Sequence, residues 1–159
     1  MKYSDNSLVS IIIPSYNEEK DIFKTVSTAA NANWINKEIL CVDDSDDEID
    51  NTKKIILDLK KKFSFINLYT QKKNKGLNGA YNLGMEKSKG DIIILLTADN
   101  IMPPDFITNI IKAFNEGFDF VVPISKVLNL DINFFARYHQ AYQDYRYSKA
   151  NFSPDWSEG

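Results

Sequence analysis

Short apolar runs alternate with amphipathic stretches along most of the chain. Runs rich in β-branched or aromatic residues predict strands at 8–13, 37–42, 65–69, 92–96 and 118–123. Between these runs, apolar residues recur every three to four positions, which predicts helices that pack one face on a sheet. The alternation of strand and helix predicts an α/β fold with a mostly parallel, doubly wound sheet. Pro14 is expected to end the first strand.

The run Ile92–Leu96 predicts a strand that is buried on both faces and leads to a carboxylate, Asp99. Mg²⁺ and Mn²⁺ prefer oxygen ligands and complete their shell with water and phosphate oxygens. A carboxylate at a strand end could therefore hold a metal with a diphosphate. The plainer alternative is that Asp99 caps the helix introduced by Pro103 and Pro104.

An acidic run follows the second predicted strand. Residues 43–50 hold six carboxylates in eight positions, but they lack the glycine and the spacing of an EF-hand loop. Calcium binding of that kind is therefore rejected. Residues 46–48 are interpreted as acids that favour the N-terminus of the next helix. Asp43 and Asp44 stand at the strand end itself, where open α/β sheets bind ligands.

Two later segments have unusual compositions. Gly79 and Gly84 lie in a predicted helix at 77–88. Each costs about 1 kcal/mol relative to alanine, so we expect a close approach to this backbone. Aromatic residues crowd a predicted helix within 131–152, which we interpret as packed in a core, with a membrane interface as the alternative. Residues 151–159 resemble a loop.

Composition narrows the classes of function. With 159 residues, 43% of them hydrophobic, the chain can form one globular domain. A net charge of −3 gives no electrostatic basis for nucleic-acid binding. A single cysteine, Cys41, and a single histidine, His139, support neither a zinc site nor a histidine-based triad. No secretory signal or membrane span is visible, so we expect a cytoplasmic location, with the inner face of the membrane as the alternative.

Four motifs in order resemble the family 2 glycosyltransferases of the GT-A fold. They occupy residues 9–19 (VSIIIPSYNEE), 42–45 (VDDS), 74–84 (NKGLNGAYNLG) and 89–103. The resemblance covers about residues 8–125. It implies a nucleotide-sugar-binding core at 1–125, followed at 126–159 by an aromatic-rich helix and loop. The chain is expected to stop before the acceptor-binding half of the family fold.

The resemblance also implies roles for particular residues. Pro14, Ser15, Tyr16 and Glu18 correspond to the first-loop residues that hold the base and the ribose. Asp44 corresponds to the carboxylate that accepts an N–H of the base. Uracil suits that acceptor, as does thymine, so a UDP-sugar is the favoured donor.

The diphosphate end of the implied site lies farther along the chain. Lys75 and Gly76 correspond to the loop beside the diphosphate, and Ala98 belongs with the donor-binding residues. Asp99 corresponds to the last residue of the D-x-D motif, the ligand of Mg²⁺ or Mn²⁺. Thr97 replaces the usual first aspartate, so metal affinity is expected to be weaker or to draw on Asn100.

The resemblance implies transfer of a sugar, with inversion, from a nucleoside diphosphate to a hydroxyl of a saccharide or lipid-linked acceptor. No residue corresponds to the general base, because Asp155 and Glu158 do not lie in the expected motif. We therefore expect donor binding without efficient transfer from this chain. The alternatives are a nucleotidyltransferase, whose glycine- and arginine-rich first loop is missing here, and a degenerate module that binds a protein partner.

Overall fold

The computed structural model describes residues 3–45, 48–71, 75–123, 126 and 134–149, and it has two compact units, Met1–Asn115 and Glu116–Gly159. The first unit contains β1 (Val9–Ser15), α1 (Ile22–Ala30), β2 (Lys37–Asp43), α2 (Thr52–Lys62), β3 (Ile66–Tyr69), α3 (Gly76–Lys87), β4 (Ile92–Leu95) and α4 (Phe106–Asn115). The second unit contains α5 (Phe134–Lys149). The predictions for residues 46–47, 72–74 and 151–159, which include Asp155 and Glu158, lie outside the described residues.

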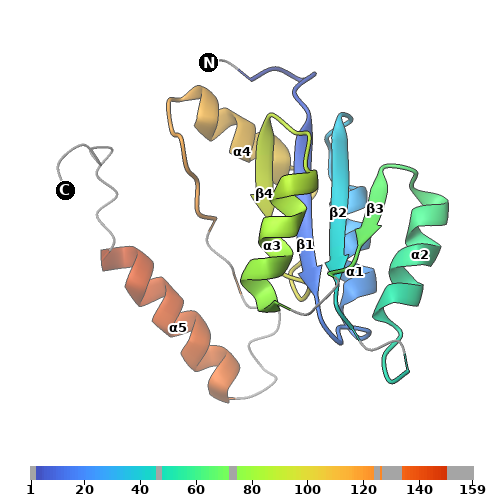
Figure 1. The fold of residues 1–159 in the computed structure, drawn as a ribbon. Helices are drawn as coiled ribbons and strands as arrows, with labels where there is room; N and C mark the ends of the chain where they lie inside the picture. The colour runs from blue at the N-terminus through green and yellow to red at the C-terminus, as the bar shows by residue number, and fades with distance from the viewer. Residues whose placement is uncertain (1–2, 46–47, 72–74, 124–125, 127–133, 150–159) are drawn as a thin grey trace. The chain divides into compact units, whose positions relative to one another are not determined.

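The strands of the first unit form a parallel sheet in the order β3-β2-β1-β4 (Figure 1). The predicted mostly parallel α/β sheet is thus confirmed. The chain moves outward from β1 to β3 on one side and then crosses to the other side of β1 to form β4. The strand order therefore reverses between β1 and β4, which is where open α/β sheets bind ligands.

Helices cover the two faces of the sheet unequally. Figure 1 shows α3 in front of the sheet and α1 behind it. The main core combines alternate β1 residues with apolar side chains of α1, α2 and α4; examples are Val9, Ile11, Ile13, Val26, Ile56 and Ile107. On the other face, Gly84 of α3 lies so close to Ile12 that an added Cβ would be 2.3 Å from the Ile12 Cγ2 atom. This contact confirms the expected close approach to the glycine-containing helix.

The prediction that the fourth strand is buried on both faces is wrong. Ile92 and Ile94 are buried, whereas Ile93 and Leu95 are 42% and 51% exposed. The exposed pair is in register with Ser10 and Ile12, on the face that α3 covers. Because α3 packs on β1 and β2, no described element of the first unit covers the matching face of β4.

The first strand also differs from the prediction, since it continues through Pro14 to Ser15. The Ile12 carbonyl accepts from Leu96 N on the β4 side (3.0 Å), and the Ser15 carbonyl accepts from Asp44 N on the β2 side (3.2 Å). Successive residues of a strand direct their peptide groups to opposite neighbours. The Pro14 nitrogen therefore faces the β4 side, beyond the last register pair of Ile12 with Leu95, where a proline is tolerated.

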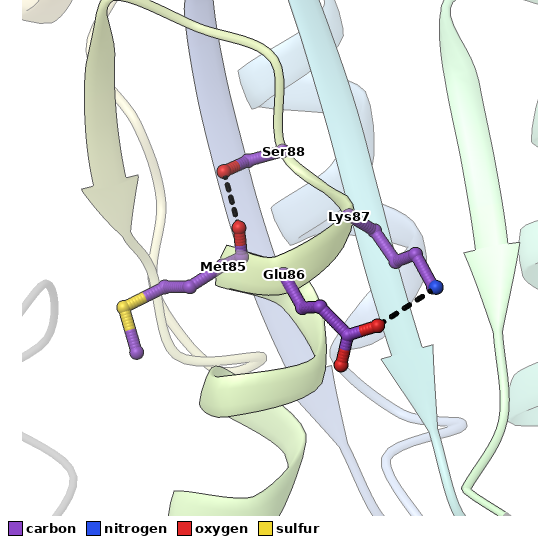
Figure 2. Close-up of polar contacts among 4 residues, drawn as sticks. All are labelled: Met85, Glu86, Lys87 and Ser88. Atoms are coloured by element: carbon purple, nitrogen blue, oxygen red, sulfur yellow. Dashed lines mark hydrogen bonds and ion pairs between the residues drawn. The ribbon is translucent and has the colours of Figure 1, made fainter.

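The end of α3 fixes the entry to β4. Ser88 donates to the Met85 carbonyl through its Oγ (2.7 Å) and its backbone N (3.3 Å), and this closes the last turn (Figure 2). The neighbouring ion pair between Lys87 and Glu86 is exposed and contributes little to stability. Gly90 then approaches Ser10, whose Oγ accepts from Gly90 N at 2.8 Å.

The second unit departs from two predictions. Residues 118–123 form no strand, and Phe120 is 81% exposed, so the predicted fifth strand is wrong. Within α5, Phe134, Tyr138 and Tyr142 are exposed and their rings stack on one another at centroid distances of 6.3 and 6.5 Å. Within the second unit, the described aromatic side chains are thus not packed in a core, contrary to the prediction. No helix among the described residues is long and apolar enough to cross a bilayer.

Candidate functional site

A cavity of about 410 Å³ opens beside the carboxyl ends of β1 and β4, at the point where the strand order reverses. Its lining contains most of the residues that the sequence predicted for the site: Pro14, Ser15, Tyr16, Glu18, Asp44, Gly76, Ala98 and Asp99. Lys75 lies just before α3, is exposed and is not part of the lining. Leu77, Ala80 and Thr97 also line the cavity.

Asp43, at the end of β2, holds the first loop in place. Its Oδ1 atom accepts from Ser15 Oγ (2.8 Å) and from Ser45 Oγ (2.6 Å). Ser45 Oγ in turn accepts from the backbone N of Asn17 (2.8 Å). Asn17 has a φ of 56°, a left-handed conformation that asparagine tolerates better than most residues. The loop beside the cavity is therefore fastened to the neighbouring strand.

Burial is the main influence on the pKa of the Asp43 carboxyl. The residue is 1% exposed, and its Oδ2 atom has no hydrogen-bond partner within the described structure. Burial raises the pKa of Asp43, with a smaller contribution from the charge of Asp50, while the hydrogen bonds from Ser45 and Ser15 act in the opposite direction. Asp43 is thus a structural carboxylate behind the cavity rather than part of its lining.

Glu18 brings a second carboxylate to the cavity. Its backbone N donates to Thr52 Oγ1 (2.8 Å), which ties the first loop to the start of α2. Burial raises the pKa of Glu18, and the negative charge of Asp99 raises it further. With Asp44 included, the described lining carries three carboxylates and no lysine, arginine or histidine. This side of the cavity therefore suits a cation better than a bare anion.

The Asp44 carboxylate accepts two hydrogen bonds from Gln71, which follows β3. Gln71 N donates to Asp44 Oδ1 (3.0 Å) and Gln71 Nε2 donates to Asp44 Oδ2 (2.5 Å). Both oxygens are engaged, yet each carboxylate oxygen can accept a second hydrogen bond. Asp44 can therefore accept an N–H group from a molecule in the cavity without releasing Gln71.

Asp99 lies in a tight turn after β4. Its Oδ1 atom accepts from Thr97 Oγ1 (2.7 Å) and from Asn100 Nδ2 (3.3 Å), and Asn100 Nδ2 also donates to Thr97 Oγ1. Since α4 begins only at Phe106, Asp99 is not its N-cap residue, and the capping alternative is wrong. Thr97 and Asn100 instead orient the carboxylate within its own turn.

Helix α1 supports this turn from behind. Thr25 Oγ1 donates to the Ala98 carbonyl (2.6 Å), and Thr28 Oγ1 accepts from Met102 N (3.2 Å). Thr25 is 1% exposed, so the hydrogen bond to Ala98 is shielded from water. The position of Asp99 relative to the sheet therefore depends on a helix that is more than seventy residues away in the sequence.

The turn is compatible with a divalent metal that takes only one or two ligands from the protein. No cluster of three or more acidic, histidine or cysteine side chains suited to a metal occurs among the described residues. Magnesium is often bound by one or two carboxylates together with water and phosphate oxygens. The exposed Asp99 carboxylate fits that pattern, because its Oδ1 atom is oriented by neighbours and it faces the same cavity as Glu18.

Sequence reasoning missed Gln71, Thr25 and Thr28. Gln71 lies beside a lysine-rich loop, and nothing in that pattern marks it as a partner of Asp44. The threonines belong to an ordinary amphipathic helix. Their roles follow only from hydrogen bonds between elements that are distant in the chain.

Comparisons with known proteins agree with this architecture. A relative, the dolichol-phosphate mannosyltransferase of Pyrococcus furiosus, is 34% identical over 115 residues, which are 72% of this chain and 32% of that protein. An Escherichia coli relative, the UDP-Glc:alpha-D-GlcNAc-diphosphoundecaprenol beta-1,3-glucosyltransferase WfgD, is 38% identical over 97 residues, which are 61% of this chain and 37% of that protein. The chain thus spans about a third of the length of these relatives.

Solved structures share the fold. Residues 1–349 of S. aureus TarS, in complex with UDP-GlcNAc, superpose with a TM-score of 0.61 at 19% identity, covering 81% of this chain and 39% of that one. The mannosyltransferase PcManGT of Pyrobaculum calidifontis, in complex with GDP-Man and Mn²⁺, gives a TM-score of 0.60 at 23% identity, covering 65% of this chain and 31% of that enzyme. The sequence model described as Glycosyl transferase family 2 matches residues 10–158. The chain therefore belongs to glycosyl transferase family 2 and has the GT-A fold.

Proposed function

We propose that the cavity binds a nucleoside diphosphate sugar, preferably a UDP-sugar, together with Mg²⁺ or Mn²⁺. The observation that carries the proposal is the meeting of Asp44, the first loop and Asp99 in one cavity at the reversal of the strand order. A nucleotide donor needs a polar acceptor for the base at one end and charge neutralisation for the diphosphate at the other. The cavity offers a carboxylate for each task.

At the base end, Asp44 is the acceptor for an N–H group. Uracil carries such a donor at N3, whereas neutral cytosine has no hydrogen on that atom. Tyr16 lines the same cavity and is 57% exposed, so it has aromatic surface to offer the base or the ribose. Pro14, Ser15 and Glu18 complete this side of the lining.

At the diphosphate end, Asp99 would hold the metal, with Gly76 at the start of α3 across the cavity. A bound metal would neutralise charge that develops on the departing nucleoside diphosphate. The carboxylates of Asp99 and Glu18 would orient the cation, and the turn formed by Thr97 and Asn100 would keep Asp99 in place. Lys75 lies beside Gly76 and is proposed to meet the outer phosphate oxygens from the edge of the site.

For the transfer of the sugar, the proposal rests on the family to which the chain belongs. The sugar would pass, with inversion, to a hydroxyl of a saccharide or lipid-linked acceptor; the names of two relatives include dolichol phosphate and undecaprenyl phosphate. No described residue is assigned as the base that deprotonates the acceptor. General-base help is worth about 10²–10⁴-fold, so we expect donor binding by this chain to exceed its transfer activity.

Thermal unfolding in the presence of nucleotides tests the donor site. The chain is heated with UDP, GDP, dTDP or CDP, each with Mn²⁺ or with EDTA. A ligand at about 100 times its dissociation constant stabilises a fold by roughly 2.7 kcal/mol, which a melting curve resolves. We expect the largest shift with UDP and Mn²⁺, and a loss of the metal-dependent part in Asp99→Asn. A curve that no nucleotide shifts would overturn the proposed donor site, and a shift insensitive to EDTA would remove the metal from it.

A further inference from the structure

Gln71 is the sole described side chain that donates to the carboxylate of Asp44. We infer that Gln71 positions Asp44 and thereby sets the preference of the site for bases that carry an N–H donor on a ring nitrogen. This inference rests on the proposed donor site. Gln71 is a positioning residue, because it does not line the cavity and acts through Asp44.

Gln71 contacts Asp44 through two hydrogen bonds. The backbone N and the side-chain Nε2 of Gln71 each donate to a different oxygen of Asp44, at 3.0 and 2.5 Å. Two hydrogen bonds to two oxygens fix both the direction and the plane of the carboxylate. Both residues follow neighbouring strands, Asp44 after β2 and Gln71 after β3, so the rigid sheet defines their separation. The remaining lone pairs of Asp44 then have one fixed orientation toward the cavity.

The Gln71 amide lies close to Gly79 of α3. A Cβ atom added to Gly79 would lie 2.8 Å from Gln71 Oε1 and 2.4 Å from the Lys75 Cβ atom. A side chain at position 79 would therefore press on both the Lys75 side chain and the amide oxygen of Gln71. A glycine inside a helix costs about 1 kcal/mol relative to alanine. The space that Gly79 leaves for Gln71 is a physical reason for that cost.

The orientation has a chemical consequence for the choice of base. Gln71 presents donors to Asp44, so Asp44 remains an acceptor and needs a donor from the ligand. Uracil and thymine supply N3–H, and guanine supplies N1–H. Neutral cytosine presents an unprotonated N3, which faces a carboxylate without any hydrogen between them. A fixed Asp44 therefore discriminates against CDP, whereas a carboxylate free to rotate could turn away from cytosine.

The experiment compares dissociation constants of UDP and CDP, measured calorimetrically in EDTA so that the metal end does not contribute. Gln71→Met removes the side-chain donor with little change in length. We expect it to weaken UDP binding about tenfold and to leave CDP binding nearly unchanged, so that the UDP preference shrinks by the same factor. Gly79→Ala should change the preference in the same direction, because its Cβ displaces the amide. Gln143→Leu, in the second unit, is the control and should change neither constant.

The outcomes separate the inference from the proposed function. A wild-type chain that binds no UDP, or that loses no UDP affinity in Asp44→Ala, would refute the donor site itself. If wild type prefers UDP, Asp44→Ala abolishes that preference, and both Gln71→Met and Gly79→Ala retain it, the role of Gln71 is refuted. A purely structural role would lower the melting temperature and both affinities together. If Gln71→Met does not fold, Gly79→Ala gives the deciding ratio.

Discussion

Asp43 is a buried carboxylate next to the cavity. Burial raises its pKa above the ordinary value of 3.8, so between these two values the folded state binds more protons than the unfolded state. The contribution of Asp43 to the free energy of unfolding therefore decreases as pH rises through the window that begins near 3.8. The carboxylate is tolerated at neutral pH because Ser15 and Ser45 both donate to Oδ1.

We predict that Asp43→Asn removes this decrease. The asparagine carbonyl can still accept from both serines, and the variant no longer carries a buried charge. Urea unfolding at several pH values from 4 to 7 measures the effect. Asp58→Asn serves as the control, since Asp58 is exposed and its hydrogen bond with Lys61 lowers its pKa, which gives the opposite sign. An unchanged pH dependence in Asp43→Asn would show that Asp43 does not titrate in this window.

At the same scale, the sequence predicted the residues that line the cavity better than the residues that hold them in place by hydrogen bonds. Asp44 and Asp99 stand at strand ends, and their position follows from the alternation of strand and helix alone. Gln71 and Thr25 carry no such mark, because a hydrogen bond between distant elements has no local signature. Lys75 was predicted from its place in a motif, but its side chain lies outside the lining.

At the scale of elements, the hydrogen bond between α1 and the turn after β4 can be removed by one substitution. Thr25→Val keeps the shape of the side chain and leaves the buried Ala98 carbonyl without its donor. We predict a loss of about 1–3 kcal/mol in the free energy of unfolding. The Mn²⁺-dependent part of the UDP shift should also decrease, because Asp99 follows Ala98 directly.

Two matched variants serve as controls for Thr25→Val. Thr25→Ser retains the hydroxyl and should restore the metal dependence, while Thr108→Val makes the same change on an exposed position of α4 and should be neutral. If Thr25→Val lowers stability but leaves the metal-dependent shift intact, the contact supports the fold and does not position Asp99.

The packing of α3 on β1 gives a second prediction at this scale. Gly84→Ala places a methyl group 2.3 Å from Ile12 Cγ2, in the centre of the sheet. Overpacking of this kind costs about 1–3 kcal/mol, which exceeds the gain of about 1 kcal/mol in helix propensity. We therefore expect lower stability in urea unfolding, whereas Asn82→Ala, on an exposed position of the same helix, should not lower it. A Gly84→Ala chain as stable as wild type would mean that α3 can shift away from β1.

Patterns of hydrophobic residues predicted most of the helices and strands, but not which other elements pack against them. The run at 92–96 predicted a strand correctly, yet its burial depends on whether another element covers the second face. The run at 118–123 has the composition of a strand, but a strand also needs a partner edge, which composition does not reveal. Pro14 was expected to end the first strand because a local rule cannot show that the paired strand has already ended.

At the scale of the whole molecule, the described core and the candidate site belong to the same unit. The main core cluster and the hydrophobic residues packed against it lie between Tyr3 and Phe114, and the cavity is lined by residues from Pro14 to Asp99. The first compact unit ends at Asn115. The boundary at residue 125, which the family resemblance implied, stays a prediction.

We predict that a chain shortened to residues 1–115 folds and retains the donor site. It contains the four-stranded sheet, the helices on both faces and the described lining of the cavity. The shortened chain should show one cooperative unfolding transition and the same UDP and Mn²⁺ dependence as the 159-residue chain. Loss of the transition would mean that residues 116–159 are needed for the fold. A retained transition without a nucleotide shift would place part of the donor site in residues 116–159, and the proposal that the cavity alone binds the nucleotide would then be wrong.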